Sequence, residues 1–269
     1  MFGKIGFIGC GNMATAIING IVNQGYIIPE NILVYDIDFN KTQALNSSLN
    51  VSTIKNIPEL VNNSDVVFLC TKPQVINEPL EIISSLDTNN KVLVSIAAGV
   101  KISTINSFFN SEQKIIRVMP NLCLMYGEGA SALAGYNVSD DEFNFVFNIF
   151  SALGKAIKTE EELLDTVTAL SGSGPAFVFK FAKELAYSAS ELGLSYEDAI
   201  TLAVQTIKGS AAVLEQSGKS IDTLISMVSS KGGTTIAGLN AMQENNFNLA
   251  VKSAVVAANN RSKELSNLK

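Results

Sequence analysis

The sequence predicts an α/β domain built on a parallel sheet, followed by a smaller all-α domain. In the first half, short Val- and Ile-rich runs alternate with helical patterns, and a glycine-rich turn follows the first run directly. Beyond about residue 159, strand-like runs give way to long helical patterns. We therefore divide the 269 residues into a domain over 1–158 and a second domain over 159–269.

Five runs in the first half have the length and composition of strands that are buried on both faces. Helical segments separate them, which predicts right-handed crossovers and a parallel sheet. Two later runs, Ala130–Leu133 and Ala156–Lys158, are weaker candidates for extending that sheet. The five main runs are Lys4–Ile8, Ile32–Tyr35, Val66–Cys70, Val92–Ile96 and Ile115–Val118.

The second half carries helical patterns with clear end signals. Ser195 followed by Asp198 predicts a helix start, and Gly193 and Gly218 stand where helices end. The last pattern is apolar on more than one stripe, from Ala250 to Ala258, and about 110 residues of helix offer little cover for it. We therefore expect a partner subunit. The patterns cover Pro175–Leu192, Tyr196–Gln216, Ile221–Val228, Thr235–Glu244 and Asn248–Leu265.

Composition excludes several classes of protein. A net charge of −6 argues against a nucleic-acid binder, and the absence of His removes His general bases, Ser-His-Asp triads and His-ligated zinc. The cysteines Cys10, Cys70 and Cys123 lack CxxC spacing, which predicts no disulfide framework and no metal site. No run approaches the roughly 18 apolar residues of a membrane span. We expect a cytoplasmic protein without a membrane or nucleic-acid partner.

The strongest local signal comes directly after the first predicted strand. Gly9-Cys10-Gly11-Asn12-Met13-Ala14 has the G-x-G-x-x-A spacing of a dinucleotide-binding Rossmann turn and opens a predicted helix over Ala14–Gln24. The glycines permit a tight turn and close approach of a pyrophosphate, which the helix N-terminus would hold. We predict that these six residues bind the cofactor; the alternative is a turn without a ligand. At a helix N-terminus, the Cys10 thiol is expected to have a lowered pKa.

The end of the second predicted strand carries a candidate for the choice of cofactor. Asp36 stands 22 residues after Ala14, where a carboxylate would bind the adenosine ribose 2′-OH. The only arginines are Arg117 and Arg261, so none is near this strand end to bind a 2′-phosphate, and Lys41 is the nearest cation. These features favour NADH over NADPH, unless Asp36 is a turn residue that points to solvent.

Two further strand ends carry candidate cofactor contacts, because ligands of doubly wound sheets bind at the carboxyl ends of the strands. The third strand finishes in Thr71-Lys72-Pro73, where Lys72 is either a ligand of the cofactor or substrate or a solvated side chain before a turn. The fourth finishes in small residues that include Ala97 and Gly99. They either admit the nicotinamide ring closely or simply form a turn.

Two glycine clusters precede helices in the second half. Ser171-Gly172-Ser173-Gly174-Pro175 leads into one helix, and Ser229 to Thr235 leads into another. The second cluster offers backbone N–H groups, two threonine hydroxyls and Lys231 to a small carboxylate. The alternative is that these residues only cap the helices.

Six segments together resemble pyrroline-5-carboxylate reductases, in order and at similar spacing, from Ile5 to about Leu265. The resemblance implies NADPH- or NADH-dependent reduction of 1-pyrroline-5-carboxylate to L-proline, the last step of proline synthesis. It also implies a helical C-terminal domain that forms a homodimer or a larger homo-oligomer. The segments are Gly9–Ala14, Lys72-Pro73-Gln74, Met119-Pro120-Asn121, Gly127–Ala130, Ser171–Ala176 and Gly232–Thr235.

The resemblance also implies roles for individual residues. Substrate contacts fall on Ser173, Gly232, Gly233, Thr234 and Thr235, with Thr235 near the imine nitrogen as a catalytic residue. We also assign a catalytic role to Lys72. Asn56 and Asn121 match cofactor-contacting asparagines of the family.

Two departures from the family pattern and two other functions remain open. Leu122 and Cys123 replace a threonine and a proline, which puts the geometry near the nicotinamide in question. Asp36-Ile37-Asp38 lacks the Asn-Arg pair that many relatives carry after the second strand and that suits NADPH, which puts the choice of cofactor in question. One alternative is a catalytically silent dinucleotide-binding relative that acts as a sensor or scaffold. The other is a 3-hydroxyacid dehydrogenase, which would need a lysine at the position of Val178; Lys180 lies about 200° further around the helix.

Overall fold

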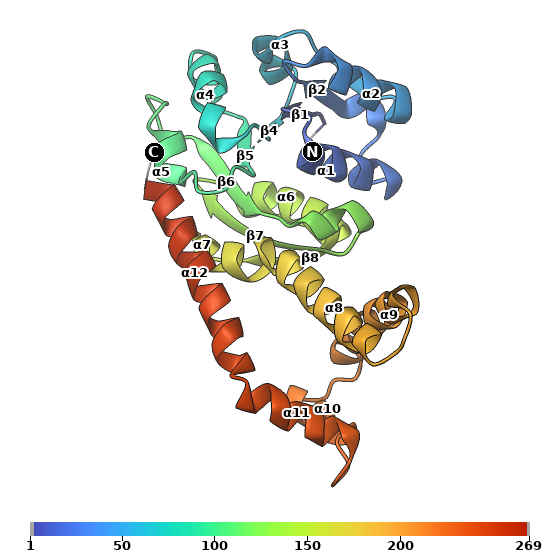
Figure 1. The fold of residues 1–269 in the computed structure, drawn as a ribbon. Helices are drawn as coiled ribbons and strands as arrows, with labels where there is room; N and C mark the ends of the chain where they lie inside the picture. The colour runs from blue at the N-terminus through green and yellow to red at the C-terminus, as the bar shows by residue number, and fades with distance from the viewer. Residues whose placement is uncertain (1–2, 268–269) are drawn as a thin grey trace. The chain divides into compact units, whose positions relative to one another are not determined.

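An eight-stranded sheet dominates the first part of the chain in the computed structural model, which describes residues 3–267 (Figure 1). The strand order is β3-β2-β1-β4-β5-β6-β7-β8, the doubly wound order that places the switch point between β1 and β4. The strands are β1 Ile5–Ile8, β2 Ile32–Tyr35, β3 Ser52–Thr53, β4 Val66–Leu69, β5 Val92–Ser95, β6 Lys114–Met119, β7 Gly129–Tyr136 and β8 Gly154–Lys158. The five main predicted strands and both weaker candidates are therefore present.

Neighbouring strands are parallel from β3 through β6, as predicted, but not between β6 and β7. β7 is antiparallel to β6, while β8 is parallel to β7. A parallel return requires a crossover of about a dozen residues or more, and residues 120–128 leave room only for a short 3-10 helix. The edge strand β3 has two residues, too few to leave a strand pattern in the sequence.

Helices cover both faces of the sheet, and the strand side chains alternate between them. Phe7 of β1 and Phe68 of β4 lie in one buried cluster with α1 and α6, while Leu69 lies in the other with α3, α4 and α5. This continuous burial on both faces explains the uninterrupted apolar strand sequences. The helices are α1 Asn12–Asn23, α2 Phe39–Leu49, α3 Ile57–Asn62, α4 Asn77–Ser84, α5 Ile102–Asn106, α6 Asp140–Ala152 and α7 Leu164–Val167.

The described residues form two units, one made of residues 3–173 with 258–267 and the other of residues 174–257. The first unit extends past the predicted boundary at residue 158 because Leu164 of α7 is fully buried against Ala132 and Ala134 of β7. A π-helical turn, Thr168–Gly172, follows α7 and ends this stretch. The last turns of helix α12 (Phe247–Asn267) also belong to the first unit.

The second unit is helical and has almost no buried side chains. It contains α8 Gly174–Glu191, α9 Tyr196–Gln216, α10 Ile221–Met227, α11 Thr234–Glu244 and the first part of α12. Ser195 Oγ accepts a hydrogen bond from Asp198 N (3.1 Å), and Gly193 and Gly218 have positive φ, as predicted for these helix ends. No helix within residues 3–267 combines the length and apolar character that crossing a membrane requires.

Candidate functional site

The glycine turn after β1 is crowded at its first glycine, Gly9, and open to space at its second, Gly11. Gly9 has φ +96°, and a Cβ there would lie 3.0 Å from the carbonyl carbon and oxygen of Cys70. Gly11 is the N-cap of α1, where no side chain caps the helix and a Cβ would meet nothing within 4 Å. Backbone N–H groups at an uncapped helix start beside open space fit a pyrophosphate.

Asp36 lies directly beside this turn. Its Oδ2 accepts a hydrogen bond from Cys10 N (2.7 Å) and its Oδ1 accepts one from Asp38 N (2.8 Å). Lys41 Nζ lies 3.6 Å from Oδ1, and the Asp36 side chain is only 8% exposed. The carboxylate therefore does not point freely into solvent; it is fixed at the edge of the glycine turn.

The expectation of a lowered pKa for the Cys10 thiol is wrong. Burial raises the pKa of Cys10 to about 12, and the Asp36 carboxylate adds to this effect while Lys41 opposes it. Cys70, at the end of β4, also has a pKa well above its usual range, because of burial and the neighbouring Cys10. Both thiols are therefore protonated and unreactive at neutral pH.

The carboxyl ends of β4 and β5 supply further polar groups and a tight loop. Thr71 Oγ1 is buried and has no hydrogen-bond partner among residues 3–267, so it can accept or donate to a bound ligand. Lys72 is exposed, and Pro73 begins a 3-10 helix, Pro73–Val75. After β5, Ala97 is buried and Gly99 has φ +75°.

Both predicted asparagines hold local structure with their side chains. Asn56 caps α3, since its Oδ1 accepts a hydrogen bond from Glu59 N (2.8 Å). Asn121 is buried and makes three hydrogen bonds: Oδ1 accepts from Cys123 N (3.2 Å) and Ala130 N (3.1 Å), and Nδ2 donates to Ser171 O (3.1 Å). Contact of either side chain with the cofactor stays a prediction, and Asn121 has one amide hydrogen left for it.

The two residues that depart from the family pattern lie in a 3-10 helix, Leu122–Tyr126, whose N-cap is Asn121. Leu122 is about half exposed, and Cys123 is partly buried. The helix ends at Gly127, whose φ is +72°. The segment thus keeps a regular turn without the missing proline.

In the second unit, the start of α11 resembles the start of α1. Its N-cap is Gly233, again in an extended conformation without a side-chain cap, and Thr234 and Thr235 are the first helical residues. A Cβ on Gly233 would lie 2.5 Å from Ser230 Oγ and 3.0 Å from Ser230 O, so a larger residue there would have to displace Ser230. Ser229 Oγ is buried and has no partner within the described chain. The geometry suits a small anion such as a carboxylate.

The structure brings the predicted cofactor residues together at the carboxyl ends of β1, β2, β4, β5 and β6, apart from Asn56, which lies before α3. Ser173 is the last residue of this first stretch, and Gly232 to Thr235 belong to the second unit. Within residues 3–267, three buried hydroxyls have no hydrogen-bond partner, and one of them belongs to Ser229, which the sequence prediction did not include among the site residues. Only its position before the glycine pair could have indicated it.

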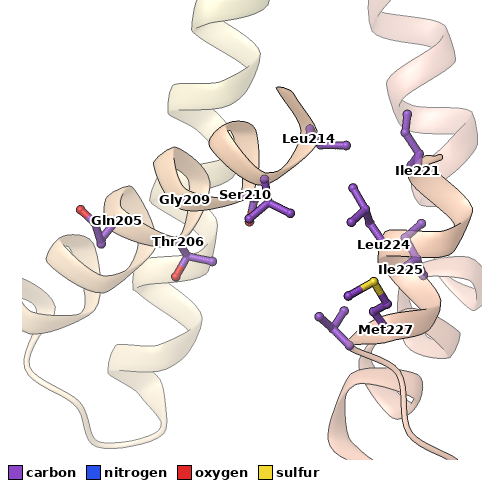
Figure 2. A pocket seen from close by; sticks show the side chains of 11 residues that line it. Gln205, Thr206, Gly209, Ser210, Leu214, Ile221, Leu224, Ile225 and Met227 are labelled. Atoms are coloured by element: carbon purple, nitrogen blue, oxygen red, sulfur yellow. The ribbon is translucent and has the colours of Figure 1, made fainter. Parts of the chain in front are cut away.

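The sequence also did not predict a groove between α9 and α10, which has a volume of about 500 Å³ (Figure 2). One side is lined by polar, small and apolar residues of α9, and the other is lined by apolar residues of α10 and the residue after it. It contains none of the predicted site residues. Its lining is Gln205, Thr206, Gly209, Ser210, Val213, Leu214, Ile221, Leu224, Ile225, Met227 and Val228.

Two family models match the chain. Residues 161–265 match pyrroline-5-carboxylate reductase dimerisation, and residues 4–99 match NADP oxidoreductase coenzyme F420-dependent. Together they cover both the glycine turn and the start of α11.

Individual relatives match over nearly the whole length. Pyrroline-5-carboxylate reductase of Methanosarcina acetivorans is 37% identical over 97% of both chains. The solved reductase of Coxiella burnetii superposes with a TM-score of 0.93 at 33% identity, covering 98% of this chain and 99% of that one. The Plasmodium falciparum reductase with NADP bound has a TM-score of 0.87 at 32% identity, covering 98% of each chain. The chain belongs to the pyrroline-5-carboxylate reductase family.

Proposed function

We propose that this protein reduces 1-pyrroline-5-carboxylate to L-proline with a reduced nicotinamide dinucleotide. The observation that carries the proposal is the pair of glycine-capped helix starts, at Gly11 and Gly233, in a chain that matches the family from end to end. One start suits the cofactor pyrophosphate and the other suits the substrate carboxylate. The 3-hydroxyacid dehydrogenase alternative is disfavoured, since Lys180 is exposed and paired with Glu184 (2.5 Å).

The residues of the first unit would hold the cofactor. Gly9 to Ala14 bind the pyrophosphate, Asp36 the adenosine ribose, and Thr71, Lys72, Pro73, Ala97 and Gly99 the nicotinamide side. The unpartnered Thr71 hydroxyl and the open space at Gly11 support this fit. The reduced nicotinamide supplies a hydride to the carbon of the C=N bond, so the protein contributes mainly orientation.

The groups of the protein would then bind and orient the substrate, which requires no histidine. The N–H groups at Gly233, Thr234 and Thr235 orient the substrate through its carboxylate. The Thr235 hydroxyl accepts a hydrogen bond from the protonated imine nitrogen and keeps that proton on the nitrogen as the amine forms. Lys72 adds positive charge beside the cofactor. Such positioning accounts for catalysis because the protonated imine is already an electrophile.

The direct test is loss of NADH absorbance when 1-pyrroline-5-carboxylate is added to the purified protein. The matched control is 1-pyrroline, which lacks the carboxylate; its kcat/KM should be lower by about 100-fold, because helix-terminus contacts to the carboxylate are absent. Proline should compete with the substrate at millimolar concentration. A protein that binds NADH but turns over neither imine would instead be the silent sensor or scaffold.

We further propose that NADH is preferred over NADPH. The Asp36 carboxylate is fixed beside the glycine turn, where it can accept a hydrogen bond from a ribose 2′-OH and repel a 2′-phosphate. Lys41 is shared between Asp36 and Asp38. The P. falciparum relative was solved with NADP bound, so this preference would be a difference within the family.

The test compares kcat/KM for the two cofactors in the wild type, Asp36→Ser and Asp38→Ser. We expect NADH to be favoured by about tenfold or more in the wild type, and the ratio to move toward NADPH by about tenfold in Asp36→Ser. Asp38→Ser is the control, because it removes a neighbouring carboxylate that also lies near Lys41 but caps α2 instead of accepting a hydrogen bond from Cys10 N. A wild type that prefers NADPH tenfold would overturn the assignment.

The active form is a homodimer or a larger homo-oligomer of this chain, in the cytoplasm. The dimerisation model covers the second unit, and the apolar groove between α9 and α10 is suited to receive helices of a second copy. The three cysteines are free, which supports a reducing compartment. Light scattering during gel filtration measures the assembly; a monomer at micromolar concentration would contradict it.

A further inference from the structure

The loop between β5 and α5, residues 96–101, is tightly constrained. Gly99 has φ +75°, a backbone conformation that residues other than glycine rarely adopt. Val100 N donates a hydrogen bond to Ala97 O (3.3 Å). The loop follows β5 at the carboxyl end of the sheet, next to β4 and the switch point. It is therefore placed on the nicotinamide side of the predicted cofactor site.

The C-terminal turns of α12 pack directly on this loop. A Cβ on Gly99 would lie 3.5 Å from the backbone of Leu265, from the backbone of Ser266 and from Ser266 Oγ. All three residues belong to the first unit, although α12 begins in the second. The outer side of the loop is thus covered at Gly99 by the last described turns of α12.

A carboxylate on α7 fixes this end of α12. Asp165 Oδ1 accepts hydrogen bonds from Ser262 Oγ (2.5 Å) and Ser266 Oγ (3.2 Å). Both serines are buried, at 7% and 4% exposed, in a helix that is otherwise mostly exposed. Thr166 adds a hydrogen bond to Asn259 (3.3 Å). Hydrogen bonds from hydroxyls to a carboxylate are stronger than those between neutral groups, so Asp165 is the main anchor.

A second carboxylate holds the other end of the loop. Glu161 Oε1 accepts a hydrogen bond from Ile102 N (2.7 Å), the first residue of α5. The same oxygen lies 2.9 Å from Nη1 of Arg117, a buried residue of β6. The loop is therefore fixed at Ile102 independently of α12, and loss of the α12 contact would loosen only its outer side.

We propose that Asp165 is a positioning residue for hydride transfer, which acts through Ser262 and Ser266 to press the end of α12 against the Ala97–Gly99 loop. The inference rests on the proposed function, because that function puts the nicotinamide against this loop. A displacement of about 1 Å at a reacting group can cost about 100-fold in rate, so a loosened loop slows catalysis. The adenosine half of the cofactor is held by Asp36 and the glycine turn, and its binding should not change.

The test uses Asp165→Ala, Ser266→Ala and Asp165→Asn in the full-length protein. Asp165→Asn retains an oxygen acceptor and is the conservative variant. Arg261→Ala is the matched control, because Arg261 lies on the same helix end in an exposed ion pair with Glu264. Three readouts are compared: kcat with saturating substrates, dissociation constants of NADH and of ADP-ribose, and amide hydrogen exchange in residues 96–101.

We expect kcat to fall about 5- to 20-fold in Asp165→Ala, less in Ser266→Ala, and to be largely restored in Asp165→Asn. Exchange in residues 96–101 should rise in parallel, while ADP-ribose affinity stays within about twofold. If Asp165→Ala does not fold, Ser266→Ala carries the same comparison.

Unchanged kcat and exchange in both Asp165→Ala and Ser266→Ala would overturn the proposal, as would an equal loss of ADP-ribose and NADH affinity, which indicates general unfolding. Failure of the proposed function is distinguishable, because a wild type without imine reductase activity still reports on NADH binding and on exchange in the loop. In that case, a loop that loosens with weaker NADH binding supports the positioning role, and a loop that does not move refutes it.

Discussion

The two units of this protein are built from similar proportions of apolar residues but bury them very differently. In the first unit, large side chains such as Phe7, Phe68 and Phe150 are fully buried in clusters on both faces of the sheet. In residues 174–257, the only buried residues are Ala182, Ala186, Ala199 and Ala203. Exposed apolar side chains such as Phe179 and Leu202 are common there.

This difference indicates that the first unit is stabilised by its own core, whereas the second is not. Four buried alanines contribute far less hydrophobic free energy than a cluster of Phe, Ile and Val side chains. Exposed apolar patches of this kind mark interaction surfaces. We therefore expect the second unit to be covered by a second copy of the chain, which would also explain why its last helical pattern is apolar beyond one stripe.

The largest effect is expected from a charge in the groove of the second unit. Leu224→Glu places an unpaired carboxylate among Val213, Ile225 and Met227, and a symmetric dimer contains the change twice. The expected cost is about 6–10 kcal/mol of association free energy per dimer, which abolishes assembly at micromolar concentration. Gel filtration with light scattering measures it.

The matched control is Gln216→Glu, which adds the same charge at an exposed position outside the groove lining. It should assemble like the wild type. A Leu224→Glu protein that remains dimeric would place the interface elsewhere on the second unit.

In the first unit, truncation of a core aromatic should cost intrinsic stability. Phe68 stacks on Phe7 with ring centroids 4.6 Å apart and is fully buried. Phe68→Ala is expected to lower the free energy of unfolding by about 3–5 kcal/mol, measured by urea denaturation. Tyr126→Ala is the control: this side chain is 85% exposed, so the change should stay within about 0.5 kcal/mol. Equal effects would contradict the contrast between core and surface.

Most of the first unit's fold was predictable because burial on both faces leaves a local signature in the sequence. The antiparallel direction of β7 was not predictable, because it depends on the length of the connection after Met119 and not on the residues of the strand itself. The boundary between the units was also hidden. The return of α12 to the first unit rests on contacts such as Ser262 with Asp165, which are far apart in sequence.

The candidate site shows the same limit. The glycine turn was recognisable because Gly9 must avoid the Cys70 backbone, a constraint that only glycine meets at φ +96°. The Cys10 pKa was predicted in the wrong direction because the local argument, a helix N-terminus, ignores burial and the Asp36 carboxylate. Local geometry was thus readable from the sequence, but the electrostatic environment was not.

A smaller effect is expected at the start of α11. Thr235→Ala removes the hydroxyl that is proposed to bind the imine nitrogen, and should lower kcat/KM by about 10- to 100-fold, or about 1.4–2.8 kcal/mol. Thr235→Ser should restore most of the activity. Thr201→Ala, on the exposed surface of α9, is the control. A Thr235→Ala enzyme with wild-type kinetics would exclude this hydroxyl from the mechanism.

The smallest effects are expected from removing two buried hydroxyls, one in each unit, that have no hydrogen-bond partner within the described chain. Ser131 Oγ lies in β7 inside the sheet, and Ser229 Oγ lies before the glycine pair of α11. An unsatisfied buried hydroxyl costs about 1–3 kcal/mol, so Ser131→Ala should leave the free energy of unfolding unchanged or raise it by about 1 kcal/mol, with unchanged kinetics. Ser229→Ala should instead raise the KM for the imine about two- to fivefold, since its hydroxyl is available to the substrate carboxylate. Thermal denaturation and steady-state kinetics on both variants measure the pair. If Ser229→Ala also leaves the KM for the imine unchanged, the Ser229 hydroxyl does not contact the substrate. The start of α11 would then bind the substrate carboxylate without it.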